Sequence, residues 1–314
     1  MYTVMNDGTE KMKTVVICGP TGIGKTSVAI DLSRAFHGEI VNADSMQIYK
    51  YMDIGSAKPT AEEQALAHHH LIDIVEPDEP FDAAIFAQRA MDTVRQLHDS
   101  DLFPFVAGGT GLYIKALIHG LFRDRPCNPD TLARLNREAK RTGPQALHER
   151  LKVCDPLAAE KIHPNDTFRI VRALEVFFET GIPISSCHEQ HGFPEPRLNA
   201  LKIGLTMDRE ALYDRINKRV DQMLDAGLVK EVESLMDRGY SPYLKPMRSI
   251  GYRHVALYLT HEMGWEDMVA LFKRDTRRYA KRQLTWFRND PDMLWFHPSE
   301  IHRIENVVDQ FIKA

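Results

Sequence analysis

The sequence predicts an α/β protein in which helices cover a parallel β-sheet, with a helical domain inserted between two parts of that sheet. Three observations lead to this fold class. Short apolar runs alternate with helical patterns through the first third of the 314 residues, a glycine-rich loop follows the first apolar run, and the middle of the chain gives helices alone. Alternating strands and helices are typical of parallel sheets, which bind ligands at the carboxyl ends of their strands.

The first part of the core is expected at residues 11–122. Its apolar runs predict strands and its amphipathic stretches predict helices. We expect strands at 14–18, 39–43, 70–75 and 102–107, and helices at 25–36, 82–98 and 110–119.

Residues 123–196 open with a run rich in Pro, Asn and Asp and then give no convincing strand, so we interpret them as a helical insertion domain. Its helices are expected near 130–142, 144–152, 156–162 and 167–180. The core then resumes over 197–314. We expect a strand at 202–207, a long helix from Asp208 to about Arg238, helices at 247–260 and 265–289, a strand at 293–296 and a C-terminal helix.

The glycine-rich loop fits G-x-x-x-x-G-K-T between a predicted strand and a predicted helix, the context of a phosphate-binding P-loop. It consists of Gly19, Pro20, Thr21, Gly22, Ile23, Gly24, Lys25 and Thr26. Its glycines let backbone N–H groups surround an anion at a helix N-terminus. Lys25 would reach the terminal phosphates and Thr26 would bind a Mg²⁺ ion. The core is therefore expected to resemble that of nucleoside triphosphate hydrolases.

Composition excludes several classes of protein. With 43% hydrophobic and 27% charged residues the chain is typical of a globular protein, and no apolar run reaches the roughly 18 residues of a membrane span. The first 13 residues lack the apolar core of a signal peptide. The four cysteines show no C-x-x-C spacing, so neither a zinc knuckle nor a disulfide framework is indicated. We expect a cytoplasmic protein without a membrane partner.

One segment departs from the net charge of −4. Basic pairs recur every four residues between Lys273 and Arg288, which places them along one helix face, with Asp275 as their one acid. Aromatic residues stand among these cations. A solvated basic helix is the ordinary interpretation of such a run. Cations with interleaved rings, however, are the composition of a nucleic-acid groove, and we favour that interpretation.

Two predicted strands end in residues that suit chemistry beside the P-loop. Asp44 follows the second strand, and it is interpreted as a general base or as a helix N-cap. The strand at 102–107 ends in Gly108-Gly109-Thr110-Gly111 with no acid. This absence weakens a motor, helicase or switch-GTPase function. Thr110 would supply a hydroxyl to an anion, although an ordinary strand-to-helix turn explains the glycines equally well.

These motifs together resemble a known family, the bacterial tRNA dimethylallyltransferases, also called tRNA isopentenyltransferases. The resemblance covers residues 14 to 288 in order. It is carried by the P-loop and by the runs DSMQIY from Asp44, DIGSAKP from Asp53, HHLID from His69, GGTGLY from Gly108, IGYR from Ile250 and AKRQLTWFR from Ala280. Two positions depart from the family pattern. Ser56 stands where Thr is commoner, and Phe168 stands where Gln is usual, which puts one polar RNA contact in doubt.

The resemblance implies transfer of the dimethylallyl group of dimethylallyl diphosphate to N6 of adenine 37, next to the anticodon, in tRNAs that read codons beginning with U. It implies Asp44 as the base, since the delocalised N6 amine is a poor nucleophile. Lys25, Thr110, Arg219 and Mg²⁺ would stabilise the departing pyrophosphate. Arg215 lies one turn before Arg219 and stays an alternative to it. We expect the prenyl diphosphate to be the productive ligand and ATP to bind weakly at most.

The resemblance also implies a monomer that turns its target adenine out into a channel and holds the anticodon stem-loop between the insertion and the basic helix. The expected tRNA contacts are Asp44, Ser45, Met46, Gln47, Thr110, Phe168, Arg169, Ile170, Val171, Arg172, Arg248, Ser249, Ile250, Gly251, Tyr252, Arg253, Lys281, Arg282, Gln283, Leu284, Thr285, Trp286, Phe287 and Arg288. Trp286 is equally consistent with a core residue.

Three other functions stay open at this point. They are a small-molecule kinase, a prenyltransferase acting on free adenine nucleotides, and a non-enzymatic RNA-binding regulator. The histidines at 68–70 are also potential metal ligands, but no acid cluster accompanies them in the sequence, so we interpret them as the start of a buried strand.

Overall fold

A computed structural model describes residues 11–120, 128–190 and 195–314 and confirms the predicted fold class. Six parallel strands form one sheet in the order β3-β2-β4-β1-β5-β6, so β1 lies near the centre between β4 and β5. The start of the expected insertion, 123–127, lies outside the described residues. Residue contacts divide the chain into two compact units, 1–119 with 197–314, and 120–196. The sequence predicted a core at 11–122 and 197–314 and an insertion at 123–196.

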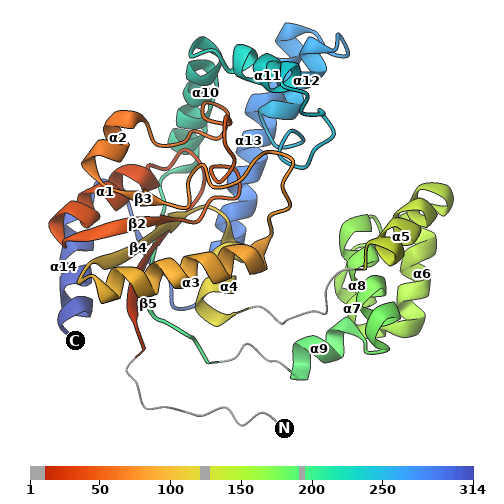
Figure 1. Ribbon diagram of the computed structural model, residues 1–314, viewed down its shortest axis with the longest axis horizontal. Coiled ribbons are helices and arrows are strands. Elements are labelled where there is room, and N and C mark those ends of the chain that lie inside the picture. Colours follow the sequence, from red (N-terminus) through yellow and green to blue (C-terminus); the bar gives the residue numbers. More distant parts are fainter. Residues whose placement is uncertain (1–10, 121–127, 191–194) are drawn as a thin grey trace. The chain divides into compact units, whose positions relative to one another are not determined.

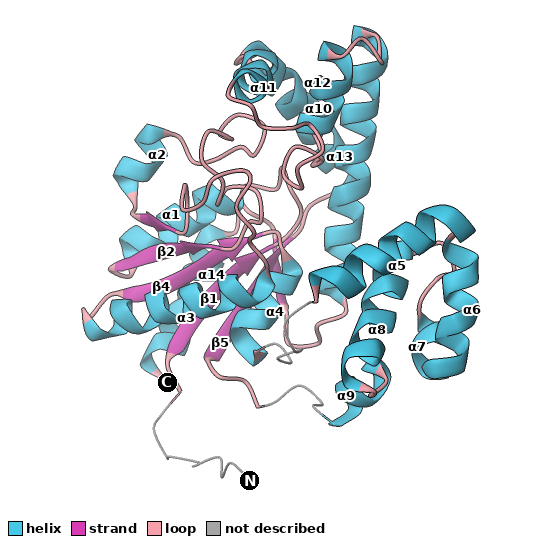
Figure 2. Ribbon diagram, turned by 45° about the vertical axis from the view of Figure 1, so that its right-hand side comes forward, coloured by secondary structure: helices cyan, strands magenta, loops and turns pink. Residues whose placement is uncertain are grey.

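The first unit contains the sheet (Figure 1). Its elements are β1 (Lys13–Cys18), α1 (Lys25–Ala35), β2 (Gly38–Asn42), α2 (Ala61–Leu66), β3 (His69–His70), α3 (Ala83–Asp99), β4 (Phe103–Gly108), α4 (Gly111–His119), β5 (Asn199–Leu205), α10 (Arg209–Asp225), α11 (Leu228–Asp237), α12 (Tyr252–Leu259), α13 (Trp265–Arg288), β6 (Leu294–Phe296) and α14 (Ile301–Lys313). Helices α1 and α14 cover one face of the sheet, and α3 and α4 cover the other (Figure 2).

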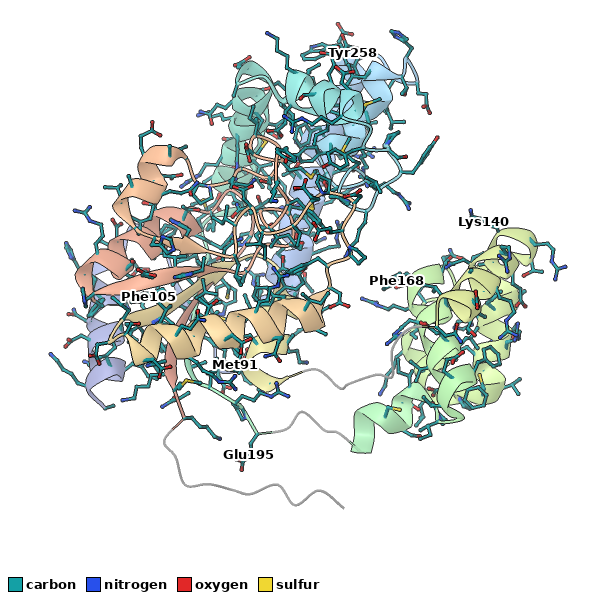
Figure 3. The ribbon with its side chains drawn as sticks, viewed as in Figure 1. Met91, Phe105, Lys140, Phe168, Glu195 and Tyr258 are labelled. Atoms are coloured by element: carbon teal, nitrogen blue, oxygen red, sulfur yellow. The ribbon has the colours of Figure 1, made fainter. Side chains whose placement is uncertain are left out.

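Apolar side chains on both faces of the strands make this sheet a buried one, as parallel sheets require. Val15, Ile17 and Phe105 are fully buried in a cluster that also takes in side chains of α1, α10 and α14. Phe105 lies within the sheet region of Figure 3. Because all six strands run the same way, their carboxyl ends meet at one edge, and the loops after β1, β2 and β4 are brought together there.

The second unit is helical throughout its described residues. It comprises α5 (Pro129–Thr142), α6 (Pro144–Cys154), α7 (Pro156–Lys161), α8 (Thr167–Thr180) and α9 (Ile184–Gln190). Leu135, Leu147, Leu151 and Leu174 are fully buried in its own core. The first four helices agree with the sequence prediction, whereas α9 was not predicted.

Four elements of the first unit differ from expectation, and in two of them a backbone angle gives the reason. The helix expected at 247–260 begins only at Tyr252. The strand expected at 70–75 ends after His70, because Leu71 and Asp73 have positive φ angles of 61° and 56°. The long helix from 208 to 238 is two helices, divided at Gly227, which has a φ of 102°. Helix α2 was not foreseen. No helix in the described ranges is both long and apolar enough to cross a membrane.

The core of the second unit gives a direct test of the packing. Leu174→Ala removes a fully buried side chain and should lower the free energy of unfolding of this unit by about 2–5 kcal/mol. Val153→Ala, on a side chain that is 86% exposed in the same unit, should change it by less than about 0.5 kcal/mol. Urea unfolding followed by circular dichroism measures both variants. Equal effects of the two substitutions would contradict the described core.

Candidate active site

The P-loop joins β1 to α1 at the carboxyl edge of the sheet. Gly22 and Gly24 have φ angles of 81° and 104°, which favour glycine, and a Cβ on Gly19 would lie 2.8 Å from the carbonyl oxygen of Leu205. Lys25 Nζ donates a hydrogen bond to the carbonyl of Pro20 at 2.9 Å, so its ammonium lies over the loop. The loop therefore has the backbone geometry and the charge of an anion site.

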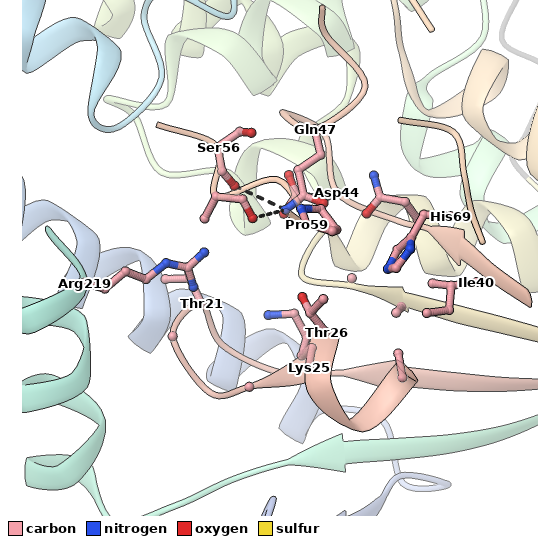
Figure 4. Close-up of a pocket in the computed structure, with 17 residues that line it drawn as sticks. Thr21, Lys25, Thr26, Ile40, Asp44, Gln47, Ser56, Pro59, His69 and Arg219 are labelled. Carbon is pink, nitrogen blue, oxygen red and sulfur yellow. Dashed lines mark hydrogen bonds between the residues drawn. The ribbon is translucent and has the colours of Figure 1, made fainter. Parts of the chain in front are cut away.

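Three cavities adjoin this loop, and Asp44 lines two of them. The first has a volume of about 90 Å³ and includes Lys25 and Thr26 in its lining, and the second has a volume of about 300 Å³. Four residues line both of them: Thr21, Asp44, Ser56 and Arg219. The second cavity adds the apolar side chains of Ile216, Val220, Met223 and Phe272. Figure 4 shows Arg219, Lys25 and Asp44 around the first cavity. A carboxylate and a guanidinium thus lie where a polar cavity meets a partly apolar one.

The turn that carries Asp44 is held by hydrogen bonds from both sides. Asp44 Oδ1 accepts a hydrogen bond from the N–H of Met46 at 2.8 Å, and Thr110 Oγ1 accepts one from the N–H of Ser45 at 3.0 Å. Thr110 lines neither cavity. In this structure its hydroxyl fixes the turn after β2, and its contact with a phosphate stays a prediction.

Gln283 connects three parts of the site. Its Oε1 accepts a hydrogen bond from the N–H of Thr21 at 2.8 Å, and its Nε2 donates one to the carbonyl of Gly109 at 2.9 Å. The side chain is buried. We expected Gln283 to contact tRNA, but its amide is occupied inside the protein, where it ties α13 to the P-loop and to the turn after β4.

Charge and burial act together on the cations of the site. Burial lowers the pKa of Lys25 to about 8, Asp44 opposes this shift, and Arg219 adds to it. Burial also lowers the pKa of Arg219, again against the influence of Asp44. Arg215 lines neither of these two cavities, but with Arg219 it lines a third, more open cavity that includes Gly22, Gly24 and Thr26, so the choice between the two arginines stays a prediction.

The wall formed by residues 53–56 is held by one carboxylate on α11. Glu231 accepts hydrogen bonds from the N–H groups of Asp53, Ile54 and Gly55 at 2.8–3.0 Å, and from the hydroxyl of Tyr252 at 2.6 Å. A Cβ on Gly55 would lie 2.5 Å from the Tyr252 ring. The neighbouring Ser56 lines both cavities. Glu231 therefore positions this wall.

The residues of the first cavity fit a Mg²⁺ ion. Thr26 and Asn42 offer the oxygen donors that Mg²⁺ prefers. His69 Nδ1 lies 2.8 Å from the carbonyl of Ala67, while its Nε2 is buried without a hydrogen-bond partner among the described residues. His69 also lines this cavity (Figure 4). His69 Nε2 is therefore available to hydrogen-bond a water molecule of a hydrated Mg²⁺ ion.

Comparison with known proteins gives a consistent result. The family model described as IPP transferase matches residues 47–290. A tRNA dimethylallyltransferase of Desulfosudis oleivorans is 53% identical over 302 residues, which cover 96% of each chain. The crystal structure of a full-length tRNA isopentenylpyrophosphate transferase from Bacillus halodurans is 40% identical, with a TM-score of 0.72 over 97% of each chain.

A eukaryotic dimethylallyltransferase acting on tRNA is also similar in structure, with a TM-score of 0.81 and 28% identity over 96% of this chain and 80% of that one. The chain belongs to the tRNA dimethylallyltransferase family. Family membership removes the kinase and the non-enzymatic regulator from the alternatives left open by the sequence.

Within this family assignment, the expected RNA contacts of α13 divide by exposure. Lys281, Arg282, Thr285, Trp286 and Arg288 are exposed, and Arg282 lines the 300 Å³ cavity. Phe287 is buried and Leu284 is partly buried against the core. We expected both residues to contact tRNA, but their side chains belong to the core. Trp286 is 44% exposed.

Two cations of the basic face of α13 have partners on a neighbouring helix, which the sequence pattern did not indicate. Lys273 pairs with Asp221 of α10 at 2.6 Å, and Arg277 Nη1 donates to Asn217 Oδ1 of the same helix at 2.6 Å. One acid, Asp221, and one amide, Asn217, thus come from a helix more than fifty residues earlier in the chain. The basic surface that remains lies toward the C-terminal end of α13.

The tRNA contacts expected at residues 46–47 and 248–253 also divide into residues that line a cavity and residues that are buried. Arg248, Ser249, Ile250 and Arg253 line the second cavity, and the buried Ser249 Oγ has no hydrogen-bond partner among the described residues. Gly251 and Tyr252 are buried. Met46 lines the second cavity and Gln47 the first, and Gln47 Nε2 also donates to the carbonyls of Ser56 and Ala57.

In the second unit, Phe168 is 82% exposed (Figure 3), and Arg169 is exposed as well. Ile170 and Val171 are core residues and cannot contact RNA through their side chains. Arg172 pairs with Glu175 at 2.8 Å.

Sequence reasoning missed the roles of Glu231 and His69. Glu231 stands in no motif that we quoted, and only the hydrogen bonds to residues 53–55 reveal it. His69 stood in the quoted HHLID run, but the run gave no sign that one of its rings would line the cavity beside the P-loop.

The pKa of Lys25 predicts how diphosphate binding depends on pH. An anion favours protonated Lys25, whose free-state pKa is about 8, so affinity should be nearly constant between about pH 7 and pH 8 and fall about tenfold for each pH unit above it. Phosphate ionisation near pH 6 lies below this window. Calorimetric titration with dimethylallyl diphosphate at pH 7, 8 and 9 measures the slope. Lys25→Met should bind more weakly and lose this dependence, whereas a flat wild-type profile would contradict the prediction.

Glu231 offers a second test. Glu231→Gln replaces an acceptor of four hydrogen bonds by an amide, and bonds to charged groups contribute about 1.5–3 kcal/mol each. We expect the free energy of unfolding to fall by at least about 2 kcal/mol and kcat/KM to fall at least about tenfold. The control Glu233→Gln changes an exposed carboxylate of the same helix and should be neutral. An unchanged kcat/KM in Glu231→Gln would show that the wall does not depend on this residue.

Proposed function

We propose that this chain transfers the dimethylallyl group of dimethylallyl diphosphate to N6 of adenine 37, beside the anticodon, in tRNAs that read codons beginning with U. The observation that carries the proposal is the pair Asp44 and Arg219 at the junction of the two cavities. A diphosphate with a five-carbon apolar tail needs a polar cavity next to an apolar one. The relatives named above act on tRNA by their names, which favours tRNA over free adenine nucleotides.

The first cavity supplies the groups for the diphosphate. The P-loop amides, Lys25 and Arg219 would bind its oxygens and stabilise the negative charge that grows as the C–O bond breaks. Thr26 and its neighbouring oxygen donors would hold Mg²⁺, which supplies further charge neutralisation when bound. The second cavity would receive the prenyl group and the extruded base, with Ile216, Val220 and Phe272 as apolar walls.

The proton balance of the reaction explains Asp44. The new bond joins the allylic carbon to N6, the bond from that carbon to the diphosphate oxygen breaks, and pyrophosphate leaves. N6 must lose a proton, and Asp44 would take it, because this carboxylate lines both cavities. Ser249 Oγ, buried in the second cavity without a partner, is available to hydrogen-bond the base.

Each unit offers exposed groups for RNA. Lys281, Arg282 and Arg288 would bind phosphates, and Phe168 and Arg169 would contact the anticodon stem-loop. The enzyme would act as a monomer in the cytoplasm. ATP is expected to be a weak ligand at most, because a site shaped for a diphosphate with a five-carbon apolar tail leaves no place for the adenine and ribose of ATP.

Asp44→Asn tests the base. The amide keeps the shape of the side chain but cannot take a proton, so kcat should fall by about 10²–10⁴-fold while RNA binding changes little. The assay follows dimethylallyl transfer to an anticodon stem-loop RNA, with binding measured separately by fluorescence anisotropy. A variant that keeps more than about a tenth of kcat would exclude the base role. If the wild-type protein forms no prenylated adenine, the proposed function fails.

A further inference from the structure

Three side chains on the edge of the sheet form a cluster that the reaction above does not use. His68 and His70 are two residues apart at β3, so their side chains point to the same face, opposite to that of His69. In the parallel pairing of β2 with β3, Ile40 stands beside His69 and Val41 beside His70. By the same register Glu39 stands beside His68. The acid that the local sequence lacked is thus supplied by a neighbouring strand.

The ligand atoms of this cluster are close together. The ring nitrogens of His68 and His70 and a carboxylate oxygen of Glu39 all lie within 4.8 Å of one another. His70 Nε2 and Glu39 Oε2 are 2.6 Å apart, and the rings of His68 and His70 meet edge to face with centroids 4.5 Å apart. Tetrahedral zinc ligands at their usual bond lengths are about 3.3 Å apart. The His70–Glu39 pair would therefore separate slightly when both bind the same ion.

We propose that Glu39, His68 and His70 bind one transition-metal ion, with Zn²⁺ as the preferred ion. Two imidazoles and one carboxylate make a three-ligand set that leaves a fourth position to water. Imidazole nitrogen suits Zn²⁺, Cu²⁺ and Ni²⁺, whereas Mg²⁺ takes oxygen ligands. This site is therefore chemically distinct from the oxygen-rich cavity around Thr26. It does not depend on the proposed reaction.

A metal ion at this site would stabilise the short edge strand β3. Strand β3 has two residues and pairs with β2 alone. An ion shared between Glu39 of β2 and the two histidines ties these strands together on the face opposite to His69. His69, whose free Nε2 lines the first cavity, projects from the same two-residue strand. Metal binding then holds the backbone from which that ring reaches the cavity.

The test is calorimetric titration of Zn²⁺ into tag-free, chelator-treated full-length protein, without diphosphate. We expect one saturable site that millimolar Mg²⁺ does not displace. His68→Ala and His70→Ala should each weaken the affinity at least about tenfold, since even the loss of an outer-shell partner costs 10–100-fold. Glu39→Ala should act in the same way. His302→Ala is the matched control, because His302 is exposed and paired with Glu305 elsewhere, and its affinity should be unchanged.

His68 is the decisive position because its side chain is exposed, so His68→Ala should fold normally. Circular dichroism of the metal-free variants checks their folding. The absence of a saturable site in the wild-type protein would overturn the proposal, and so would equal affinity in wild-type protein and His68→Ala. Zn²⁺ should also raise the melting temperature of the wild-type protein more than that of His68→Ala. An equal rise in both proteins would again overturn the proposed metal site.

Discussion

The two hydrogen bonds of Gln283 hold the active site together. The P-loop and the turn after β4 belong to neighbouring strands, and one buried amide from a helix near the other end of the chain joins them. A side-chain amide has both a donor and an acceptor, so Gln283 satisfies a backbone N–H on one loop and a carbonyl on the other. Neither a carboxylate nor an ammonium could do both. The chemistry of the cavity depends on this neutral bridge between its walls.

Around this bridge, the protein separates the groups that bind charge from the groups that position backbone. Lys25 and Arg219 lie in the cavity, where burial makes each cation costly and an anionic ligand favourable. Glu231, Thr110 and Gln283 act on backbone groups. This second set stabilises loops whose N–H and C=O groups would otherwise lie unpaired near a cavity, and it fixes the place of Asp44.

The sequence predicted the parts of the site whose chemistry lies in contiguous residues. The P-loop and Asp44 stand at strand ends, and parallel strands bring such ends together whatever the intervening sequence. Tertiary pairing could not be predicted. Asp221 neutralises Lys273 from another helix, and Glu231 reaches residues 53–55 across the fold. Backbone conformation was equally hidden, since nothing in the pattern of 208–238 marked Gly227 as a break rather than a tolerated glycine.

The order of strands in the sheet has a consequence for synthesis of the chain. Strand β1, which carries the P-loop, emerges first from the ribosome, yet one of its two neighbours is β5, and the whole helical insertion lies between them. The insertion contains only local helix contacts and can fold while translation continues, whereas β1 must wait for a distant partner. An mRNA truncated before β5 would yield a folded insertion and a sheet in which β1 is an exposed edge strand, a species prone to aggregation and recognised by chaperones.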